Sequence, residues 1–380
     1  MTSAQSWTGA PAAPAPAPLD RADLRRRIGA ALAAHLDGQA GRLAQVGEEL
    51  APMATAATDF VMGGGKRLRP AFAYWGWRGA GGDPRHDDAV VRAVSCLELL
   101  HACALVHDDV MDASDIRRGA PAVHRRFAAL HRASGWSGSA DGFGEAAAIL
   151  VGDLCLIWAD GMLHSAGLPP EAVARAVPVY DDTRTELMAG QYLDVLEQVL
   201  GGRPAGGRIV GRPVDRAMRV ARFKSGRYTV ERPLQLGAAI AGAGGGLVAS
   251  YSAYGIPLGE AFQLRDDVLG VFGDPVETGK PAGDDLREGK RTVLVALAVE
   301  RAAPAQAEVL RRRLGDPRLP AEGVAELRTV IAETGALAEV ERMVGDRTEQ
   351  ALAALAVADM DDEARTVLRE LAVAATTRRG

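Results

Sequence analysis

The sequence predicts an all-α protein, and three observations support this fold class. Apolar residues recur every three or four positions over long stretches, which is the period of an amphipathic helix. Alternating apolar and polar residues bounded by turn pairs, the pattern of strands, are nearly absent. Gly/Pro-rich pieces such as "GGGKRLRP", "RASGWSGSADGFG" and "LGGRPAGGRIVGRP" separate the periodic stretches, as loops between helices do.

The predicted helices follow one another along most of the chain. The first begins near Asp20, interpreted as its N-cap, and continues to Met62. Further helical periods cover residues 87–110, 145–166, 171–199, 213–241, 247–272, 291–314, 321–334 and 336–375. Residues 1–19 form a Pro/Ala-rich tail that is expected to be disordered. No other piece is typical of a linker and no fixed repeat is present, so residues 20–380 are expected to form a single domain.

The composition is that of a soluble globular protein, with 380 residues, 48% hydrophobic and 24% charged. A net charge of −5 gives no case for nucleic-acid binding. Cys96, Cys103 and Cys155 lie in apolar surroundings without metal-type spacing, which indicates a reducing compartment. No uninterrupted apolar run reaches about 18 residues. The start of the chain has no signal pattern. We therefore expect a cytoplasmic protein without stable membrane insertion.

The stretch "LELLHACALVHDDVMDASDIRRGAPAVH" places acids on an apolar helix. Asp108 and Asp112 are four residues apart and share a helix face, with Asp109 at its border. At roughly 5 Å and an effective dielectric of about 20, each repulsion is about 3 kcal/mol, so the cluster is expected to bind a cation. All-oxygen ligands favour Mg²⁺. A solvated helix end is the alternative, but the following Arg117 and Arg118 suit phosphate oxygens.

The stretch "GEAFQLRDDVLGVFGD" repeats this theme. Asp266 and Asp267 are expected near the end of a second buried helix, because apolar residues precede them at helical spacing. Gly270 occupies the position that matches Asp112, so this motif is weaker as a ligand set. A helix end with ordinary surface acids is the alternative interpretation.

Basic groups occur in three further stretches. "GGGKRLRP" places Lys66 and Arg69 after glycines that let a backbone approach an anion. "RFKSGRYT" contains Lys224, and "TGKPAGDDLREGKRT" contains Lys280 and Lys290. Solvated turns and loops are the alternative for each stretch taken alone. The simplest ligand that these basic groups and the two acid clusters would bind together is a pair of diphosphates with bridging Mg²⁺. An apolar helical cavity would keep an allylic cation away from water.

These five motifs, in the order in which they follow one another along the chain, resemble the trans-isoprenyl diphosphate synthases of the polyprenyl synthetase family, and within it the bacterial geranylgeranyl diphosphate synthases. The resemblance extends over about residues 60–292. It implies an isoprenoid synthase-type helical bundle around a deep central cavity, usually in a homodimer. It also implies condensation of isopentenyl diphosphate with dimethylallyl, geranyl or farnesyl diphosphate, assisted by about three Mg²⁺ ions.

The resemblance also implies a role for each motif residue. The metal ligands would be Asp108, Asp112 and Asp266. The catalytic set would be Asp108, Asp109, Asp112, Arg117, Lys224, Asp266 and Asp267. The allylic diphosphate would be held by Arg117, Lys224, Ser225, Gln263 and Lys280. Isopentenyl diphosphate would be held by Gly65, Lys66, Arg69, His101 and Arg118. Lys290 is a further member of the basic set.

Product length in this family is implied to depend on residues just before the first acidic motif. Ala104 and Cys103 are small here, and one helical turn of about 5.4 Å corresponds to about one isoprene unit. Leu100, about two turns before Asp108, would form the next barrier to the growing prenyl chain at the bottom of the pocket. This favours the twenty-carbon product, geranylgeranyl diphosphate. Farnesyl and geranylfarnesyl or longer products remain open.

Three other classes of protein compete with this interpretation. A class I terpene cyclase normally carries an Asn/Ser/Glu motif, and none is found downstream. A non-catalytic subunit of a prenyl synthase typically loses acids or arginines that are present here. A diphosphate-hydrolysing enzyme would explain the acids and Mg²⁺, but not a deep apolar wall.

Overall fold

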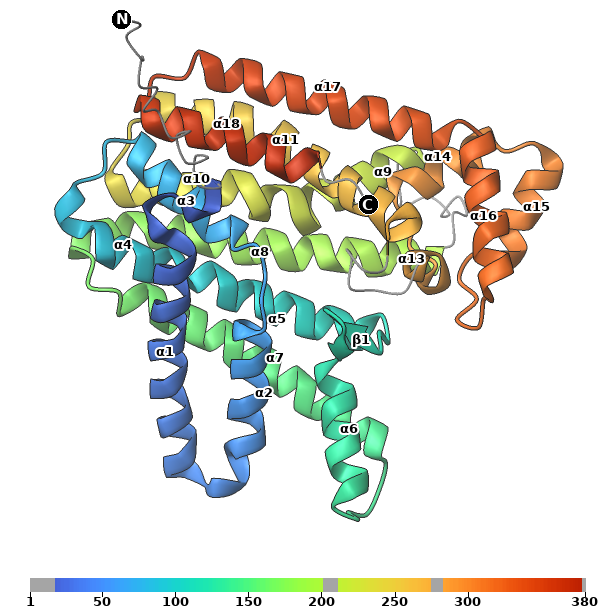
Figure 1. Cartoon of the computed structure of the whole chain (residues 1–380), viewed down its shortest axis with the longest axis horizontal. Coiled ribbons are helices and arrows are strands. Elements are labelled where there is room, and N and C mark those ends of the chain that lie inside the picture. The colour runs from blue at the N-terminus through green and yellow to red at the C-terminus, as the bar shows by residue number, and fades with distance from the viewer. Residues whose placement is uncertain (1–17, 201–210, 275–282, 378–380) are drawn as a thin grey trace, which may run out of the picture.

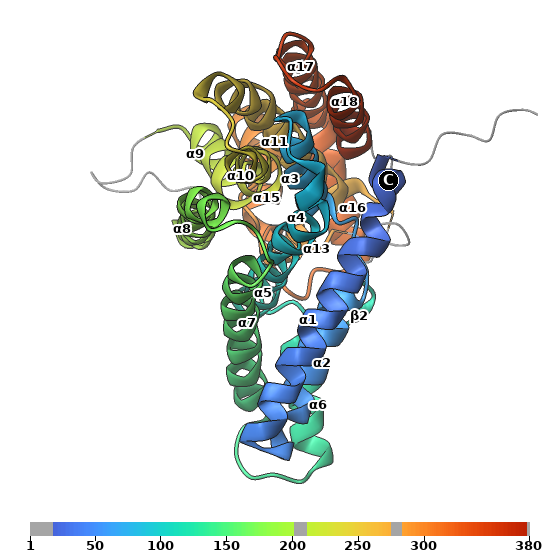
Figure 2. The ribbon, with the colours of Figure 1, turned by 90° about the vertical axis from the view of Figure 1, so that its left-hand side faces the viewer.

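The computed structural model describes residues 18–200, 211–274 and 283–377, in which almost all regular structure is helical. The prediction of an all-α fold is confirmed. Several helices, among them α3, α8, α11 and α17, run roughly along the long axis of the molecule (Figure 1). A quarter turn shows α1, α2, α6 and α7 extending away from this layer (Figure 2).

The helices have the following bounds. The first half of the chain contains α1 (Leu24–Val46), α2 (Ala51–Met62), α3 (Leu68–Gly79), α4 (Asp87–Val94), α5 (Cys96–Met111), α6 (Val123–Ala133), α7 (Ala140–His164) and α8 (Pro170–Leu200). The second half contains α9 (Pro213–Val220), a π-helix (Ala221–Glu231), α10 (Arg232–Ala241), α11 (Gly245–Phe272), α13 (Asp284–Glu288), α14 (Val293–Arg301), α15 (Pro304–Arg313), α16 (Ala321–Glu333), α17 (Ala336–Ala356) and α18 (Asp362–Thr376). Short 3₁₀ turns cover Pro18–Asp23, Glu48–Leu50 and Pro84–His86.

The prediction of one helix from Asp20 to Met62 is wrong. Helix α1 begins at Leu24, after a 3₁₀ turn that contains Asp20. It ends before Gly47, whose backbone is extended at φ 176° and ψ 145°. An extended residue cannot continue the helical hydrogen-bond ladder, so the chain turns there and α2 runs back beside α1. The part of the predicted tail at residues 1–17 lies outside the described residues.

Other helices are shorter than predicted. The apolar period in the sequence continues across the points where these helices end, so it did not reveal them. Ser95 separates α4 from α5, and its hydroxyl donates to the Val91 carbonyl at 2.7 Å, an interaction that bends helices. Pro304 starts α15 and so divides the stretch 291–314. Asp361 caps α18 by accepting from the Ala364 N–H, which divides the stretch 336–375.

A small antiparallel ladder follows α5, in a stretch where no strand was predicted. Strand β1 (Ile116–Arg117) pairs with β2 (Ala120–Pro121), with Arg117 opposite Ala120. Arg118 and Gly119 form the connecting turn with φ 54° and 76°. Two successive positive φ angles are typical of a type I′ hairpin turn. The hairpin fixes the directions of the two arginines beside the end of α5.

The buried side chains form two hydrophobic clusters. The larger contains residues of α1 to α8, α10 and α18, and the smaller contains residues of α9, α13 to α16 and the end of α11. Helix α11 contributes to both, with Leu258 in the first and Leu264 in the second. Helix α17 does so too, through Leu355 and Val340. These two long helices connect the clusters.

Among the residues that the structure describes, two apolar segments have the length and hydropathy of a membrane span, although neither is an uninterrupted apolar run. They are Pro84–Met111 and Ala140–His164, with mean hydropathies of 1.8 and 1.7. Of the first apolar window, 78% is buried inside the protein, as expected for a core helix. Only 50% of the window in α7 is buried, although α7 packs against α5 and α6. One face of α7 is therefore apolar and uncovered in the single chain.

Candidate active site

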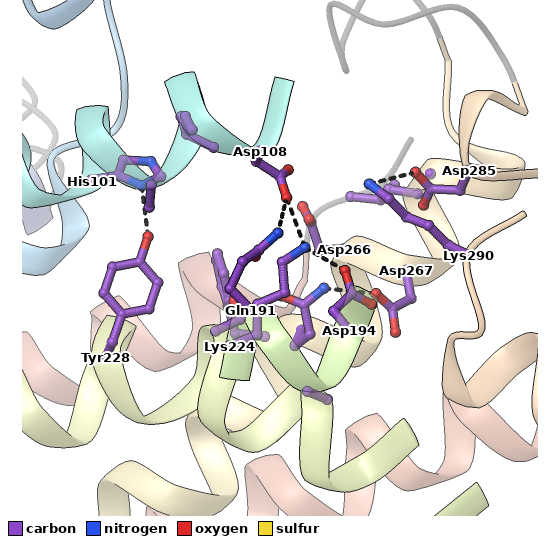
Figure 3. Close-up of a pocket in the computed structure, with 18 of the residues that line it drawn as sticks. His101, Asp108, Gln191, Asp194, Lys224, Tyr228, Asp266, Asp267, Asp285 and Lys290 are labelled. Carbon is purple, nitrogen blue, oxygen red and sulfur yellow. Dashed lines mark hydrogen bonds and ion pairs between the residues drawn. The ribbon is translucent and has the colours of Figure 1, made fainter. Parts of the chain in front are cut away.

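A cavity of about 610 Å³ lies where α3, α5, α8, the π-helix and α11 meet, and its size is typical of a small-molecule site. Most of the predicted site residues line it: Gly65, Lys66, Arg69, His101, Ala104, Asp108, Arg117, Arg118, Lys224, Ser225, Gln263, Asp266, Asp267 and Lys290. Acidic side chains from α5 and α11 converge on this space with basic side chains between them (Figure 3). Lys280 lies outside the described residues.

Lys224 bridges carboxylates of two helices at the centre of the site. Its ammonium donates to Asp108 Oδ1 at 2.9 Å and to Asp194 Oδ2 at 2.6 Å. Gln191 Nε2 donates to the same oxygen of Asp108 at 2.9 Å (Figure 3). Sequence reasoning missed Gln191 and Asp194. Their three-residue spacing in "GQYLD" on a partly buried helix was the available signal.

The backbone around Lys224 brings this lysine close to α8. Lys224 lies in the π-helix, a wider helical form that is frequent at functional sites. A Cβ at Gly190 of α8 would lie only 2.3 Å from the Lys224 backbone nitrogen. Glycine at this position therefore permits the close approach that carries the ammonium to Asp108 and Asp194.

Charge pairing keeps both groups of this bridge ionised although they are buried. Burial opposes ionisation of Asp108, but Lys224, Lys290 and Arg117 together hold its pKa well below its usual range. Burial likewise opposes the charge of Lys224, but Asp108 and Asp194 raise its pKa. The site therefore holds a carboxylate and an ammonium at neutral pH.

Asp109 does not line the cavity but holds Arg117 from behind. Asp109 is fully buried, and its Oδ1 accepts from Arg117 Nε at 2.8 Å and also from Nη2. Nη2 lies 3.7 Å from Asp108 Oδ2. Asp109 thus directs a permanently charged guanidinium toward the first acidic position.

Asp112 lies just past the end of α5 and is bound by Lys290. Lys290 Nζ is 3.1 Å from Asp112 Oδ2 and 2.8 Å from Glu288 Oε2. Burial raises the pKa of Asp112, Lys290 opposes the rise, and Asp108 adds to it. Asp112 is therefore coupled to a loop far along the chain, and the cavity lining does not include it directly.

A second, mostly basic corner of the cavity lies toward the loop before α3. Arg69 packs over the Tyr228 ring at 4.2 Å from its centroid. His101 Nδ1 is 2.7 Å from the Tyr228 hydroxyl. Burial and nearby arginines lower the pKa of His101 well below 6.5, whereas burial raises that of Tyr228 to about 12. The imidazole is thus neutral, and its Nδ1 shares a hydrogen bond with the phenol hydroxyl.

The turn of the β-hairpin brings a second cation, Arg118, to this corner, against the glycine-rich loop. Arg118 Nη1 donates to the Gly64 carbonyl at 2.8 Å. Gly65 has φ 125°, a conformation that side chains strongly disfavour, so glycine is required there. Arg67, in contrast, is buried in an ion pair with Glu98 at 2.6 Å. It supports the loop beneath the cavity.

The second acidic motif projects into the cavity from α11 (Figure 3). Gln263 Nε2 donates to Asp267 Oδ1 at 2.7 Å. Burial raises the pKa of Asp267 well above its ordinary value. The Gln263 hydrogen bond opposes this, and Asp285, Asp266 and Asp194 add to it. Several acids therefore share a small space at this end of the cavity.

The oxygen donors of the site suit a hard cation such as Mg²⁺. Within residues 18–200, 211–274 and 283–377, no three acid, imidazole or thiol groups meet closely enough to hold a metal ion as they stand. The ammonium of Lys224 lies between Asp108 and Asp194, and that of Lys290 between Asp112 and Glu288. A position where several carboxylate oxygens surround an ammonium also fits a divalent cation, when an anionic substrate binds together with that cation.

The three predicted chain-length residues differ in their surroundings. Ala104 lines the cavity on α5. Cys103 is fully buried toward α7, with its Sγ 3.8 Å from His107 Nδ1. Leu100 is also fully buried and, like Cys103, is not among the lining residues of the described cavity. Only Ala104 therefore faces the space that the structure shows.

Comparison with known proteins identifies the family of this chain. The family model for polyprenyl synthetase matches residues 51–332, which is most of the chain. The chain belongs to the polyprenyl synthetase family. It is therefore a prenyltransferase, and enzymes of this family depend on magnesium.

Curated relatives of this polyprenyl synthetase include enzymes with different products. The chain is 32% identical to a geranylfarnesyl diphosphate synthase of Aeropyrum pernix, over 83% of this chain and 91% of that protein. It is 33% identical to a geranylgeranyl diphosphate synthase of Mycobacterium tuberculosis, over 77% and 75% of the two chains.

Solved structures agree with this assignment. A geranylgeranyl pyrophosphate synthase from Corynebacterium glutamicum, complexed with isoprenyl diphosphate and magnesium, superposes with a TM-score of 0.89 at 42% identity. The match covers 95% of this chain and 99% of that chain.

Proposed function

We propose that this polyprenyl synthetase elongates allylic diphosphates with isopentenyl diphosphate and releases geranylgeranyl diphosphate. The observation that carries the proposal is the convergence of Asp108 and Asp266 from two helices on one cavity with a separate basic corner. An acidic half suits a diphosphate that arrives with metal ions. A basic half suits a second diphosphate that needs none.

The acidic half would bind the allylic substrate. Asp108, Asp112 and Asp266 would hold about three Mg²⁺ ions, which when bound neutralise the departing diphosphate. Arg117, oriented by Asp109, and Lys224 would donate to the diphosphate oxygens. Ser225, Gln263, Lys280 and Lys290 would complete this set. Departure of the diphosphate leaves an allylic cation, which the surrounding apolar helices shield from water.

The basic half would bind isopentenyl diphosphate. Lys66, Arg69 and Arg118 supply positive charge beside Gly65, whose missing side chain leaves room for a phosphate. With Nδ1 accepting from Tyr228, neutral His101 would present its Nε2–H as a donor for the same group. This corner would place the isopentenyl double bond beside the allylic carbon. The released diphosphate would take the proton lost after condensation.

Product length is the finer part of the proposal. Ala104 is the small residue that faces the cavity one helical turn before Asp108. A small side chain at this depth leaves space for a growing prenyl tail. The twenty-carbon product agrees with the names of the Mycobacterium tuberculosis and Corynebacterium glutamicum relatives. A twenty-five-carbon product, as the Aeropyrum pernix relative is named for, is the main alternative.

We also propose that the enzyme is a cytoplasmic homodimer that pairs through α7. Phe143, Leu150 and Ile157 recur every seven residues along one face of α7 and are 37%, 54% and 64% exposed. A continuous apolar stripe of this kind is typical of a helix that packs against a partner. A second copy of the chain would cover it.

One assay tests the activity and the product together. The purified full-length chain is incubated with labelled isopentenyl diphosphate, farnesyl diphosphate and Mg²⁺, and the products are dephosphorylated and separated by chain length. Geranylgeraniol as the main alcohol supports the proposal, and EDTA should abolish it. A second sample, with labelled farnesyl diphosphate, is extracted before dephosphorylation. There, cyclised hydrocarbon would indicate a terpene cyclase, free farnesol a hydrolase, and unreacted diphosphates a non-catalytic subunit.

A further inference from the structure

One face of α8 extends from the acidic end of the cavity into the core beneath it. Asp194 and Leu187 both line the cavity and are seven residues, or two helical turns, apart. Tyr180 precedes Leu187 by another seven residues and therefore lies on the same face of α8. At 1.5 Å per residue it is about 10 Å deeper than Leu187. It is not among the residues that line the described cavity.

The Tyr180 ring lies close to the part of α5 that precedes Ala104. Tyr180 is only 1% exposed and belongs to the larger hydrophobic cluster. Burial raises the pKa of its phenol well above the ordinary value, and the thiols of Cys96 and Cys103 on α5 add to the rise. Such effects fade with distance. Tyr180 therefore lies beneath the cavity, between α8 and the first half of α5.

Small side chains separate the end of the cavity from Tyr180. On α8, Thr183 lies between Leu187 and Tyr180 on the same face, and it is buried. Its hydroxyl donates to a backbone carbonyl one turn earlier at 2.7 Å, so it is satisfied within its own helix. On α5, Ala104 and Cys103 are small as well. On this face of α8, Tyr180 is thus the first large ring below the cavity.

The Tyr180 hydroxyl is buried without a hydrogen-bond partner among the described residues. Buried hydroxyls nearly always have one, because an unmade hydrogen bond is costly. The other tyrosines buried in the described chain follow this rule, namely Tyr74, Tyr228, Tyr251 and Tyr254. The end of the Tyr180 side chain therefore meets only apolar surroundings. Such surroundings suit the end of a hydrocarbon tail.

Arg184 holds the Tyr180 ring in place. Its guanidinium carbon lies 4.7 Å from the ring centroid. Its Nη1 donates to Asp160 Oδ1 of α7 at 3.2 Å, so the contact also joins α8 to α7. Leu100, the barrier expected from the sequence, is an aliphatic side chain that can change rotamer to admit a tail. A rigid ring held by an ion pair is the firmer barrier.

We propose that Tyr180 is the residue that stops the growing prenyl chain, so that α8 limits product length together with α5. The inference rests on the proposed function, because it concerns the tail of the same substrate. The tail would pass Ala104 and Leu187, enter the layer of small side chains and end against the ring. A stop at Tyr180 leaves space for about two isoprene units more than a stop at the depth of Leu187, at about one unit per helical turn.

Binding of substrate analogues tests this inference without turnover. The full-length chain is titrated by calorimetry, in Mg²⁺, with prenyl thiodiphosphates of fifteen, twenty, twenty-five and thirty carbons. The length limit is the longest analogue that binds before Kd rises at least tenfold, and twenty carbons is expected for the unaltered chain. Tyr180→Ala should raise this limit by at least one isoprene unit, because the tail enters the space of the ring.

Two variants serve as controls. Tyr180→Phe keeps the ring, so it should keep the length limit, and it should not lower Tm because the lost hydroxyl has no partner. Tyr254→Ala removes a tyrosine of α11 that is equally buried but does not line the cavity, and whose hydroxyl donates to the Leu368 carbonyl at 2.7 Å. It should lower Tm and leave the limit unchanged.

The outcomes distinguish this inference from the proposed function. An unchanged limit in folded Tyr180→Ala overturns the role of Tyr180, and so does an equal rise in Tyr254→Ala, which would indicate general loosening. Should Tyr180→Ala fail to fold, Tyr180→Leu decides by the same limit. Elongation by the unaltered chain is assayed separately. A chain whose limit moves as expected but which does not elongate contradicts the proposed function only.

Discussion

Lys224 Nζ lies 2.9 Å from Asp108 Oδ1 and so joins the π-helix to the first acidic helix across the cavity. Asp194 accepts from the same ammonium at 2.6 Å. One lysine therefore balances two buried carboxylates where metal ions are proposed to bind. In the substrate-free protein, this cation relieves a repulsion that would otherwise disfavour the site.

Replacement of Lys224 tests this balance in the absence of substrate. Lys224→Met should lower the free energy of unfolding by about 3 kcal/mol, because it leaves two buried carboxylates without their cation. Chemical denaturation in EDTA measures the change. Arg311→Met removes a fully solvent-exposed partner of Glu308 and should leave stability unaltered. Equal stability of Lys224→Met and the unaltered chain would show that the bridge contributes nothing.

Loss of a first-motif carboxylate should affect chemistry more than folding. Asp108→Asn and Asp112→Asn should each reduce kcat/KM by orders of magnitude, because each removes a proposed metal ligand. Steady-state elongation assays measure this, with Tm as the folding check. Asp115→Asn is the control, since Asp115 is exposed and pairs with Arg125. Normal turnover in both variants would contradict the assignment of metal ligands to α5.

A larger residue at position 104 should shorten the product. Ala104→Phe would fill the cavity one helical turn before Asp108 and should shift the product from twenty to fifteen carbons or fewer. Chain-length analysis of the dephosphorylated products measures the shift. Ala104→Ser keeps the side chain small and should retain the product. An unchanged product from Ala104→Phe would show that another residue limits the length of the product.

The two diphosphate sites predict different effects of the basic residues. Lys66→Ala should raise KM for isopentenyl diphosphate more than KM for farnesyl diphosphate, because Lys66 lies in the corner assigned to the first substrate. Two-substrate kinetics give both constants. The opposite ranking would mean that the assignment of the two halves is reversed.

The neutral imidazole of His101 predicts acid sensitivity of folding. Its pKa is lowered in the folded protein, chiefly by burial, whereas the unfolded chain titrates near 6.5. Below about pH 6.5 the unfolded state therefore binds the extra proton and stability falls, by up to about 1.4 kcal/mol per pH unit for one proton. His101→Asn should weaken the fall in Tm between pH 7 and pH 5. Identical pH profiles for His101→Asn and the unaltered chain would contradict the prediction.

The all-α fold and the placement of most site residues could be predicted from sequence. The apolar period of α5 fixes which face is buried, and His101, Ala104 and Asp108 therefore fall on the cavity side as expected. Helix ends were less predictable. The apolar period runs on through Ser95 without interruption, so the break between α4 and α5 is decided by local hydrogen bonds that spacing does not reveal.

Contacts between distant segments could not be predicted. Asp194 on α8 has the sequence signature of any acid on an amphipathic helix, and only the fold brings it to Lys224. Asp112 was expected on the helix face beside Asp108, but its partner Lys290 comes from a later loop. The gap at Gly270 was visible in the sequence. That the Asp285 carboxylate lies against Gly270 depends on how α13 packs against α11.

The central claim is that carboxylates on α5 and α11 face each other and hold metal ions on one departing diphosphate. A crystal structure of the full chain with Mg²⁺ and farnesyl thiodiphosphate tests this most directly. The account predicts metal ions that join Asp108 and Asp112 to one side of the thiodiphosphate and Asp266 to the other, with Lys224 turned toward its oxygens. A thiodiphosphate bound without metal between the two helices, or bound away from both acid groups, would contradict it.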